Sequence, residues 1–205
     1  MPFEKTITVA LTGASGMPYA LRLIECLLAA RCRVYVLASQ AAAVVAKQEM
    51  DFTLPARAPE LQIFLAQYLH ASADQLQVFG REEWFAPIAS GSNPPDAMVV
   101  CPCTMSTLAM IAAGLADNLI GRAADVVIKE NRKLILVPRE TPFSAIHLEN
   151  MLKLARLGVV ILPANPGFYH HPQSVQDLVD FVVARILDQL ALPHHLLARW
   201  GASER

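Results

Sequence analysis

Small and hydroxyl-bearing residues directly follow three apolar runs of the chain, at the turn Gly13–Gly16, at Ser39 and at Thr104–Thr107. If the runs are parallel strands that each lead into a helix, these residues converge on one crevice at the carboxyl edge of the sheet. Backbone N–H groups and helix N-termini at such an edge bind phosphate. Ordinary helix N-capping explains any one of these residues as well, but the coincidence of three favours a binding site.

The turn Gly13–Gly16 does not match the known nucleotide fingerprints. The dinucleotide pattern GxGxxG needs glycine at position 15, where Ser15 stands, and no Walker lysine follows the turn. NAD and ATP are therefore disfavoured. Hydroxyls and N–H groups without a cluster of positive charges suit a mononucleotide such as FMN, whose single phosphate helix N-termini can hold.

Several cations stand where they could hold a second phosphate. Arg122 and Lys129 are seven residues apart in one expected helix, so they share a face, although a solvated charged face is an equally good interpretation. Arg139 and Glu140 follow an apolar run at an expected strand end, which favours a functional role. Arg185, in the last expected helix, fits a structural role as well.

Other candidate chemistry is weak or absent. Trp84 lies in an irregular segment, where tryptophan often only anchors a loop or an oligomer contact. The six histidines show no ligand spacing, and the four cysteines form no CxxC pair, so we expect no metal, no disulfide and reduced thiols. No GxSxG elbow is present.

The composition indicates a folded protein that associates with itself. Of 205 residues, 54% are hydrophobic and 17% are charged, which leaves the surface of a monomer under-charged. The net charge of −1 argues against nucleic acid and anionic membranes as partners. The uncharged stretch 97–116 is interrupted by Pro102 and by hydroxyl residues, so we expect no membrane insertion. The acidic Glu4 and the short apolar run from Ile7 to Leu11 lead us to expect no secretory signal and a cytoplasmic protein.

The alternation of apolar runs with helical stretches predicts an α/β protein: a three-layer, Rossmann-like or flavodoxin-like fold with a parallel sheet covered by helices on both faces. We expect a single flavin-binding domain over residues 1–205, with a C-terminal tail from about 191 to 205 that includes Trp200. The segment 51–95, which contains five prolines, is expected to leave the sheet. Strand-like runs lie at Thr6–Leu11, Val34–Leu37, Leu76–Phe79, Ala97–Cys101, Leu134–Val137 and Val159–Leu162. Helices are expected at Tyr19–Arg31, Ala41–Glu49, Leu61–Leu69, Ser106–Ala113, Leu119–Glu130, Ser144–Leu157 and Val175–Leu190.

Three segments, in this order, closely resemble the flavin prenyltransferases of the UbiX type: VALTGASGMPYALRL, CPCTMSTLAMIAAGLADNLIGRAADVVIKENRKLILVPRETPFS and NPGFYHHP. The resemblance runs from Thr6 to about Leu190. The family usually reads CPCSM where this chain reads CPCTM, and threonine keeps the hydroxyl. Decarboxylases of the same superfamily carry a histidine near the first helix and a PxMNxxMW segment, and this chain has neither.

The resemblance implies a site residue by residue. It places the FMN contacts at Gly13, Ala14, Ser15, Ser39, Thr104, Met105, Ser106, Thr107 and Arg139. It places the phosphate of dimethylallyl monophosphate at Ser90, Arg122, Lys129, Tyr169 and Arg185. Proton handling is implied for Ser15, Glu49 and Glu140, and an aromatic wall for Trp84.

The resemblance also implies a reaction and partners. Family members join a dimethylallyl group to N5 and C6 of reduced FMN, and the prenylated FMN serves UbiD-type decarboxylases in ubiquinone biosynthesis and related pathways. A homo-oligomer is implied, by family resemblance a dodecamer, with an interface that completes the substrate site. The alternatives are an FMN-dependent decarboxylase of the same superfamily, a flavodoxin-like electron carrier, and a flavin carrier without turnover.

Overall fold

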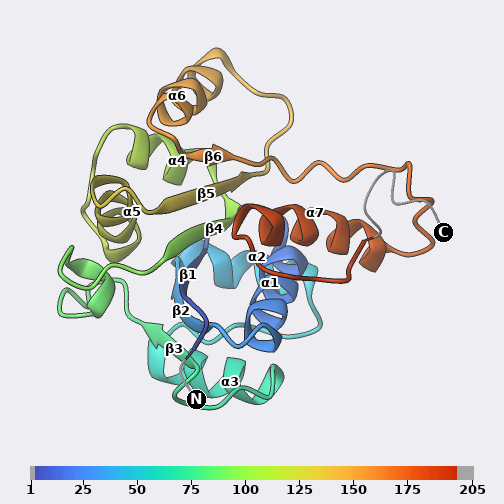
Figure 1. Ribbon diagram of the computed structural model, residues 1–205, viewed down its shortest axis with the longest axis horizontal. Coiled ribbons are helices and arrows are strands. Elements are labelled where there is room, and N and C mark those ends of the chain that lie inside the picture. Colours follow the sequence, from blue (N-terminus) through green and yellow to red (C-terminus); the bar gives the residue numbers. More distant parts are fainter. Residues whose placement is uncertain (1–2, 198–205) are drawn as a thin grey trace.

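The computed structural model describes residues 3–197, which form one parallel sheet between two layers of helices (Figure 1). The strands are β1 Thr6–Leu11, β2 Arg33–Ala38, β3 Leu76–Phe79, β4 Ala97–Cys103, β5 Lys133–Pro138 and β6 Val160–Ile161. The helices are α1 Met17–Ala29, α2 Gln40–Glu49, α3 Ala58–Tyr68, the 3₁₀ turn η1 Pro87–Ala89, α4 Met105–Ala112, α5 Leu119–Lys129, α6 Ala145–Arg156 and α7 Val175–Gln189. The predicted three-layer α/β architecture is confirmed.

The strands follow the order β3-β2-β1-β4-β5-β6, and every neighbouring pair is parallel. This is the doubly wound order of Rossmann folds. The central strands β1 and β4 are buried almost throughout, as expected for strands that helices cover on both sides.

Alternating side chains of each strand build two separate cores. In β1, Ile7, Val9 and Leu11 pack into the core beneath α1, α2, α3 and α7, whereas Ala10 packs beneath α4, α5 and α6. The chain therefore leaves β1 toward one face and β4 toward the other. The carboxyl ends of these two neighbouring strands form the topological switch point, where doubly wound sheets bind ligands.

The buried hydroxyl of Thr12 ties the two strand ends together at that point. Its Oγ1 donates to the carbonyl of Pro102 at 2.7 Å and accepts the N–H of Thr104 at 2.9 Å. One threonine after β1 thus fixes the backbone that leads from β4 into α4.

The expected excursion over residues 51–95 is wrong for its first two thirds. Helix α3 packs on the sheet, and β3 pairs with β2 from Val34↔Leu76 to Leu37↔Phe79, so it is the edge strand. A run of four residues such as Leu76–Phe79 is long enough for an edge strand, because an edge strand pairs with only one neighbour. Two segments remain irregular: residues 50–57, between α2 and α3, and residues 80–96, which contain η1.

The structure bears on the expectations about membrane insertion and about the C-terminal tail. Within residues 3–197, no helix is long and apolar enough to span a membrane. The expected tail is described up to Leu197, where His194 lies 3.1 Å from Asp188, and Trp200 lies outside the described residues.

Candidate active site

The turn between β1 and α1 approaches the start of α2 very closely. A Cβ atom on Gly13 would lie 2.4 Å from the Cβ atom of Ala41, which no pair of side chains tolerates. Gly16 has φ 131°, a conformation that favours glycine, and it begins α1. These two positions need glycine for geometric reasons, and they bring Ala14 and Ser15 to the carboxyl edge.

Glu49, the last residue of α2, occupies the N-terminus of α1. Its carboxylate accepts the N–H of Gly16 at 2.9 and 3.1 Å and the N–H of Met17 at 2.8 Å. A negative charge at a helix N-terminus is stabilised by the unpaired N–H groups and the helix dipole. The predicted anion site at this turn is thus satisfied by the carboxylate of the protein itself, which places Glu49 beside Ser15.

The hydroxyl groups at the other two strand ends cap helices. Ser39 accepts the N–H of Ala42 at 3.2 Å at the start of α2. Thr104 accepts the N–H of Thr107 at 3.1 Å at the start of α4, and the two hydroxyls share a hydrogen bond of 2.9 Å. The capping interpretation holds for Ser39 and Thr104. The free N–H groups of both helix starts still face the same edge of the sheet.

The residues after β5 join this edge as expected. The N–H of Arg139 donates to the carbonyl of Cys103 at 3.4 Å, so Arg139 lies beside the start of α4, where Met105 is buried and Ser106 is exposed. The side chains of Arg139 and Glu140 make no hydrogen bond or ion pair with any described residue. Both are therefore available to a ligand.

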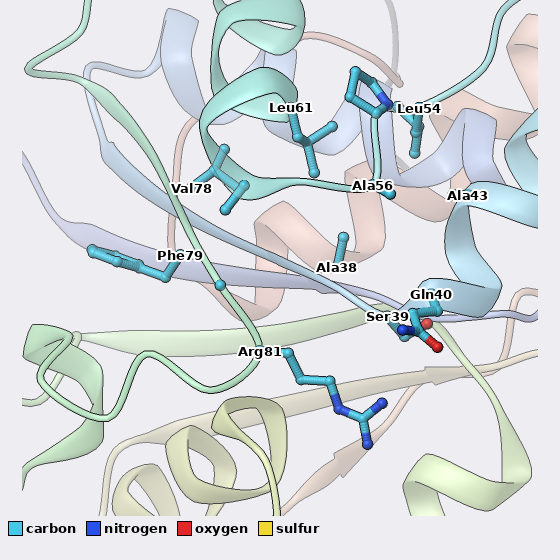
Figure 2. Close-up of a pocket in the computed structure, with 13 residues that line it drawn as sticks. Ala38, Ser39, Gln40, Ala43, Leu54, Ala56, Leu61, Val78, Phe79 and Arg81 are labelled. Carbon is cyan, nitrogen blue, oxygen red and sulfur yellow. The ribbon is translucent and has the colours of Figure 1, made fainter.

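A pocket opens beside Ser39, between the ends of β2 and β3 (Figure 2). Its volume is about 180 Å³, and its walls are mainly apolar, with side chains such as Leu54, Leu61 and Val78. Figure 2 shows the guanidinium of Arg81 on the same side of the pocket as Ser39 and Gln40. Sequence reasoning missed Arg81, because β3 was not recognised as a strand of the sheet. A cation two residues after a strand end was the available signal.

Two of the predicted phosphate residues, Arg122 and Lys129, lie on α5 and form a second cluster with the segment 89–91, which contains Ser90. Arg122 donates from Nε to the carbonyl of Ala89 at 2.9 Å and pairs with Asp125 at 2.8 Å. One residue past Ser90, a Cβ atom on Gly91 would lie 2.5 Å from Nζ of Lys129. The segment 89–91 thus packs along the helix face that carries both cations. Lys129 also pairs with Glu130 at 2.5 Å.

Helix α5 begins near the carboxyl edge, where the N–H of Leu119 donates to the carbonyl of Arg81 at 2.8 Å, but the Lys129 end of this cluster lies away from that edge within one chain. Lys129 ends the helix that leads into the start of β5, so it lies toward the amino edge of the sheet. Arg185 lies toward the end of α7, paired with Asp188 at 2.6 Å. The C-terminus of that helix is tied to the starts of β1 and β5 by Lys5 and Lys133, which donate to the carbonyls of Leu190 and Gln189.

The two predicted aromatic residues lie in exposed loops. Trp84 is 45% exposed in the segment between β3 and η1. Tyr169 is 58% exposed after β6, and its ring packs edge-on against Phe181 of α7 at 5.7 Å. The predicted residues therefore fall into a carboxyl-edge group, the α5 cluster, and the outlying positions Trp84, Tyr169 and Arg185.

Burial makes the thiols of β4 unsuitable as nucleophiles. Cys101 and Cys103 are fully buried, and burial raises the pKa of both thiols far above the usual value.

Tyr19, another residue that sequence reasoning missed, packs its ring against Gly16. Burial first, and then the electrostatic effects of the neighbouring Cys101 and Glu49, raise the pKa of the Tyr19 phenol, so it remains a neutral donor. Among the described residues, no group of His, Cys, Asp and Glu is arranged to hold a metal ion.

Comparison with known proteins decides the family. A model of the family described as Flavoprotein matches residues 2–187. The flavin prenyltransferase UbiX of Pseudomonas aeruginosa is 59% identical over 98% of this chain and 96% of its own length. That of Methanocaldococcus jannaschii is 44% identical over 95% of this chain and 98% of its own length. The chain belongs to the family of UbiX-type flavin prenyltransferases. The predicted flavoprotein enzyme of the transferase class is thereby confirmed.

Solved structures of the family share the whole fold. A dodecameric FMN-dependent UbiX-like decarboxylase from Escherichia coli O157:H7 matches with a TM-score of 0.84 and 43% identity, over 96% of this chain and all of that one. AnUbiX (PadA1), in complex with FMN and dimethylallyl pyrophosphate, matches with a TM-score of 0.86 and 38% identity, over 98% of this chain and 99% of that one. The flavin of both descriptions is the expected FMN.

Proposed function

We propose that this enzyme transfers a dimethylallyl group from dimethylallyl monophosphate to reduced FMN. The allylic carbon forms a bond to N5 as its bond to the phosphate oxygen breaks. Ring closure then consumes the remaining double bond of the dimethylallyl group: one alkene carbon takes up a proton, the other forms a bond to C6, and C6 gives up its proton, which completes a fourth ring. The observation that carries the proposal is the α5 cluster, where Arg122 and Lys129 lie along the segment 89–91 that contains Ser90. A protein that only binds FMN has no need of this second cationic site.

The carboxyl edge fits FMN as one substrate. The starts of α2 and α4 supply free N–H groups beside Ser39 and Thr104. Gly13 allows the start of α2, at Ala41, to lie close to the turn between β1 and α1. Ala14, Ser15, Met105, Ser106 and Thr107 line the same edge, and Arg139 lies beside it without an ion-pair partner among the described residues. We assign these residues to the flavin.

Cations stabilise the departing phosphate in this scheme. Charge develops on the phosphate as the allylic bond breaks, and preorganised cations stabilise such charge more strongly in the transition state than in the ground state. Ser90, Arg122, Lys129, Tyr169 and Arg185 hold that phosphate. Trp84 supplies an aromatic face for the allylic cation and excludes water from it.

Carboxylates move the protons of both steps: the first alkylation releases the N5 proton, and ring closure delivers one proton to the alkene and removes one from C6. Glu49 is within reach of Ser15 at the start of α1, and Glu140 follows Arg139 at the same edge. We assign proton transfer to Glu49, directly or through Ser15, and to Glu140.

The division of the site within one chain supports assembly from several copies. The flavin group lies at the carboxyl edge, and Lys129 and Arg185 lie toward the opposite edge of the sheet. We propose that a neighbouring copy brings these cations to the flavin of the first, in a homo-oligomer that is a dodecamer by analogy with the relative from Escherichia coli.

The resemblance to the family supports a proposal for the destination of the product. We propose that the prenylated FMN passes to a UbiD-type decarboxylase in ubiquinone biosynthesis, in the cytoplasm. An FMN-dependent decarboxylase remains the second candidate function, because one related structure is described as such an enzyme.

One anaerobic experiment separates these functions. The protein is mixed with reduced FMN and with dimethylallyl monophosphate or diphosphate, and the flavin is analysed by mass spectrometry. A prenylated flavin formed over many turnovers supports the proposal. An unmodified flavin with either phosphate excludes the transferase, and release of CO₂ from an added carboxylic acid identifies the decarboxylase.

A further inference from the structure

One cation at the carboxyl edge is not used in the proposed scheme. Arg81 stands two residues after β3 and is exposed, and its side chain makes no hydrogen bond or ion pair with any of the described residues. Its backbone is held at two points. The carbonyl of Arg81 accepts the N–H of Leu119 at 2.8 Å, and the preceding N–H of Gly80 donates to the carboxylate of Glu83 at 2.9 Å. An unpaired guanidinium thus extends from a fixed loop.

Arg81 lies at the polar rim of the pocket beside Ser39. Figure 2 shows Ser39, Gln40 and Arg81 on one side of this pocket, and apolar side chains such as Leu61 on the other. Ser39 accepts the N–H of Ala42, so the N–H groups of residues 40 and 41 have no acceptor within α2. Apolar walls do not solvate an anion. An anion in this pocket therefore lies at the rim, between those N–H groups and the guanidinium.

The two ends of α2 fit the two ends of FMN. Glu49, at the end of α2, already fills the start of α1 with its carboxylate, so the phosphate of FMN does not bind there. The same turn contacts the start of α2, because Ala41 lies against Gly13. A flavin whose ring lies by Ser15 can therefore place its phosphate at the start of α2. That helix start offers unpaired N–H groups, a favourable dipole and the guanidinium of Arg81.

We infer that Arg81 binds the phosphate of FMN, together with the N–H groups at the start of α2, and selects FMN over flavins that lack the phosphate. The inference rests on FMN as a substrate of the proposed function, and on no step of its chemistry. A guanidinium can donate two parallel hydrogen bonds to phosphate oxygens, so one arginine fixes both the position and the orientation of the group. The start of α4, with Arg139 beside it, is the competing place for the phosphate.

Paired titrations with FMN and riboflavin test this assignment. Riboflavin has the same ring and ribityl chain but no phosphate, so a residue that binds only the phosphate affects FMN alone. Arg81→Ala should lower the affinity for oxidised FMN about 10- to 100-fold, as the loss of a charged hydrogen bond does, and leave the affinity for riboflavin unchanged. Arg81→Lys keeps the charge and should retain most of the FMN affinity. Fluorescence quenching measures each affinity, and both variants should keep the wild-type melting temperature because Arg81 is exposed.

Arg57→Ala is the matched control, and Arg139→Ala is the competing variant. Arg57 precedes α3 beside the same pocket and pairs with Glu60 at 3.4 Å, so its removal should leave both affinities unchanged. A loss confined to FMN in Arg139→Ala, with none in Arg81→Ala, assigns the phosphate to the start of α4 and overturns the inference. An equal loss of FMN and riboflavin affinity in Arg81→Ala, or a loss with Arg57→Ala as large as that with Arg81→Ala, overturns it as well.

The salt dependence of FMN binding gives a second readout. Added NaCl should weaken FMN binding by the wild type more steeply than FMN binding by Arg81→Ala, because salt screens the charge pair that the variant lacks. An equal salt dependence contradicts the inference. The titrations require no turnover, so a failed prenylation assay leaves the assignment of Arg81 intact. Conversely, wild-type FMN affinity in Arg81→Ala overturns this inference alone and leaves the proposed function to its own assay.

Discussion

The carboxylate of Glu49 accepts the backbone N–H of Gly16 through both of its oxygens, at 2.9 and 3.1 Å. The end of α2 is thereby fixed to the start of α1. The same carboxylate is our proposed proton acceptor, so in the proposed mechanism one side chain both orders the carboxyl edge and accepts a proton there.

The Glu49→Gln variant separates these two roles. Loss of a general base typically lowers the affected step by ~10²- to 10⁴-fold, whereas departure of the phosphate depends on the cations and should continue. The variant should bind both substrates but accumulate a flavin attached only at N5. The neutral amide also interacts less favourably with the start of α1, at a cost of about 1 kcal/mol of unfolding free energy. Mass spectrometry follows the adduct, and thermal unfolding follows the stability.

Ser174→Ala is the matched control for Glu49→Gln. Ser174 caps α7 by accepting the N–H of Asp177, and its loss costs about 1 kcal/mol as well. This variant should lose stability and retain turnover. If Glu49→Gln forms the mature product at the wild-type rate, Glu140 is the carboxylate that takes the proton.

Replacement of Lys129 by alanine tests the α5 cluster. The lysine should matter more to the departing phosphate than to the ground state, so turnover should fall steeply while FMN affinity stays near the wild-type value. Arg132→Ala, an exposed cation just beyond the same helix, should leave both unchanged. Fluorescence quenching measures the affinity. Equal loss of FMN binding and turnover would place Lys129 at the flavin, and wild-type turnover would make it a surface charge.

Two buried threonines of the β1 segment should respond oppositely to valine. Thr12 makes two hydrogen bonds, and Thr12→Val leaves the N–H of Thr104 and the carbonyl of Pro102 unpaired, at a cost of about 1 to 3 kcal/mol. The hydroxyl of Thr8 is buried and has no partner among the described groups, so Thr8→Val should be neutral or stabilising. Urea unfolding measures both. A stable Thr12→Val variant would contradict the role of Thr12 as the link between the strand ends.

Alkylation of the thiols should depend strongly on pH. The thiolate is the reactive form, and burial raises the pKa of Cys26 to about 11. In the native protein the labelling rate at Cys26 should therefore rise about tenfold per pH unit until the pH approaches that value. Cys101 and Cys103 should stay unlabelled until the protein unfolds. Peptide mapping after iodoacetamide treatment checks this, and native labelling of Cys101 would contradict its burial.

The sequence was sufficient for the sheet apart from its edge strand β3, and for the group of residues at the carboxyl edge. Apolar runs that alternate with helical stretches predicted the parallel sheet, because strands covered on both faces must be apolar throughout. Parallel strands share a carboxyl edge, so Ser39, Thr104 and Arg139 could be brought together from their positions after strands alone. The helical repeat likewise placed Arg122 and Lys129 on one face.

Other features depended on contacts between distant segments. Nothing local marks Glu49 as the partner of Gly16, because the contact joins the end of one helix to the start of another. The edge position of β3, and with it Arg81, depended on a pairing with β2 that a four-residue run does not reveal.

The sequence by itself thus determined which elements form and which polar residues share an edge, since both follow from short-range periodicity and from the common direction of the strands. Only the tertiary structure decided that Lys129 and Arg185 lie away from Ser39 and Thr104 in a single chain. The physical reason is that helices return antiparallel to the strands, so residues at their ends are carried to the opposite edge of the sheet.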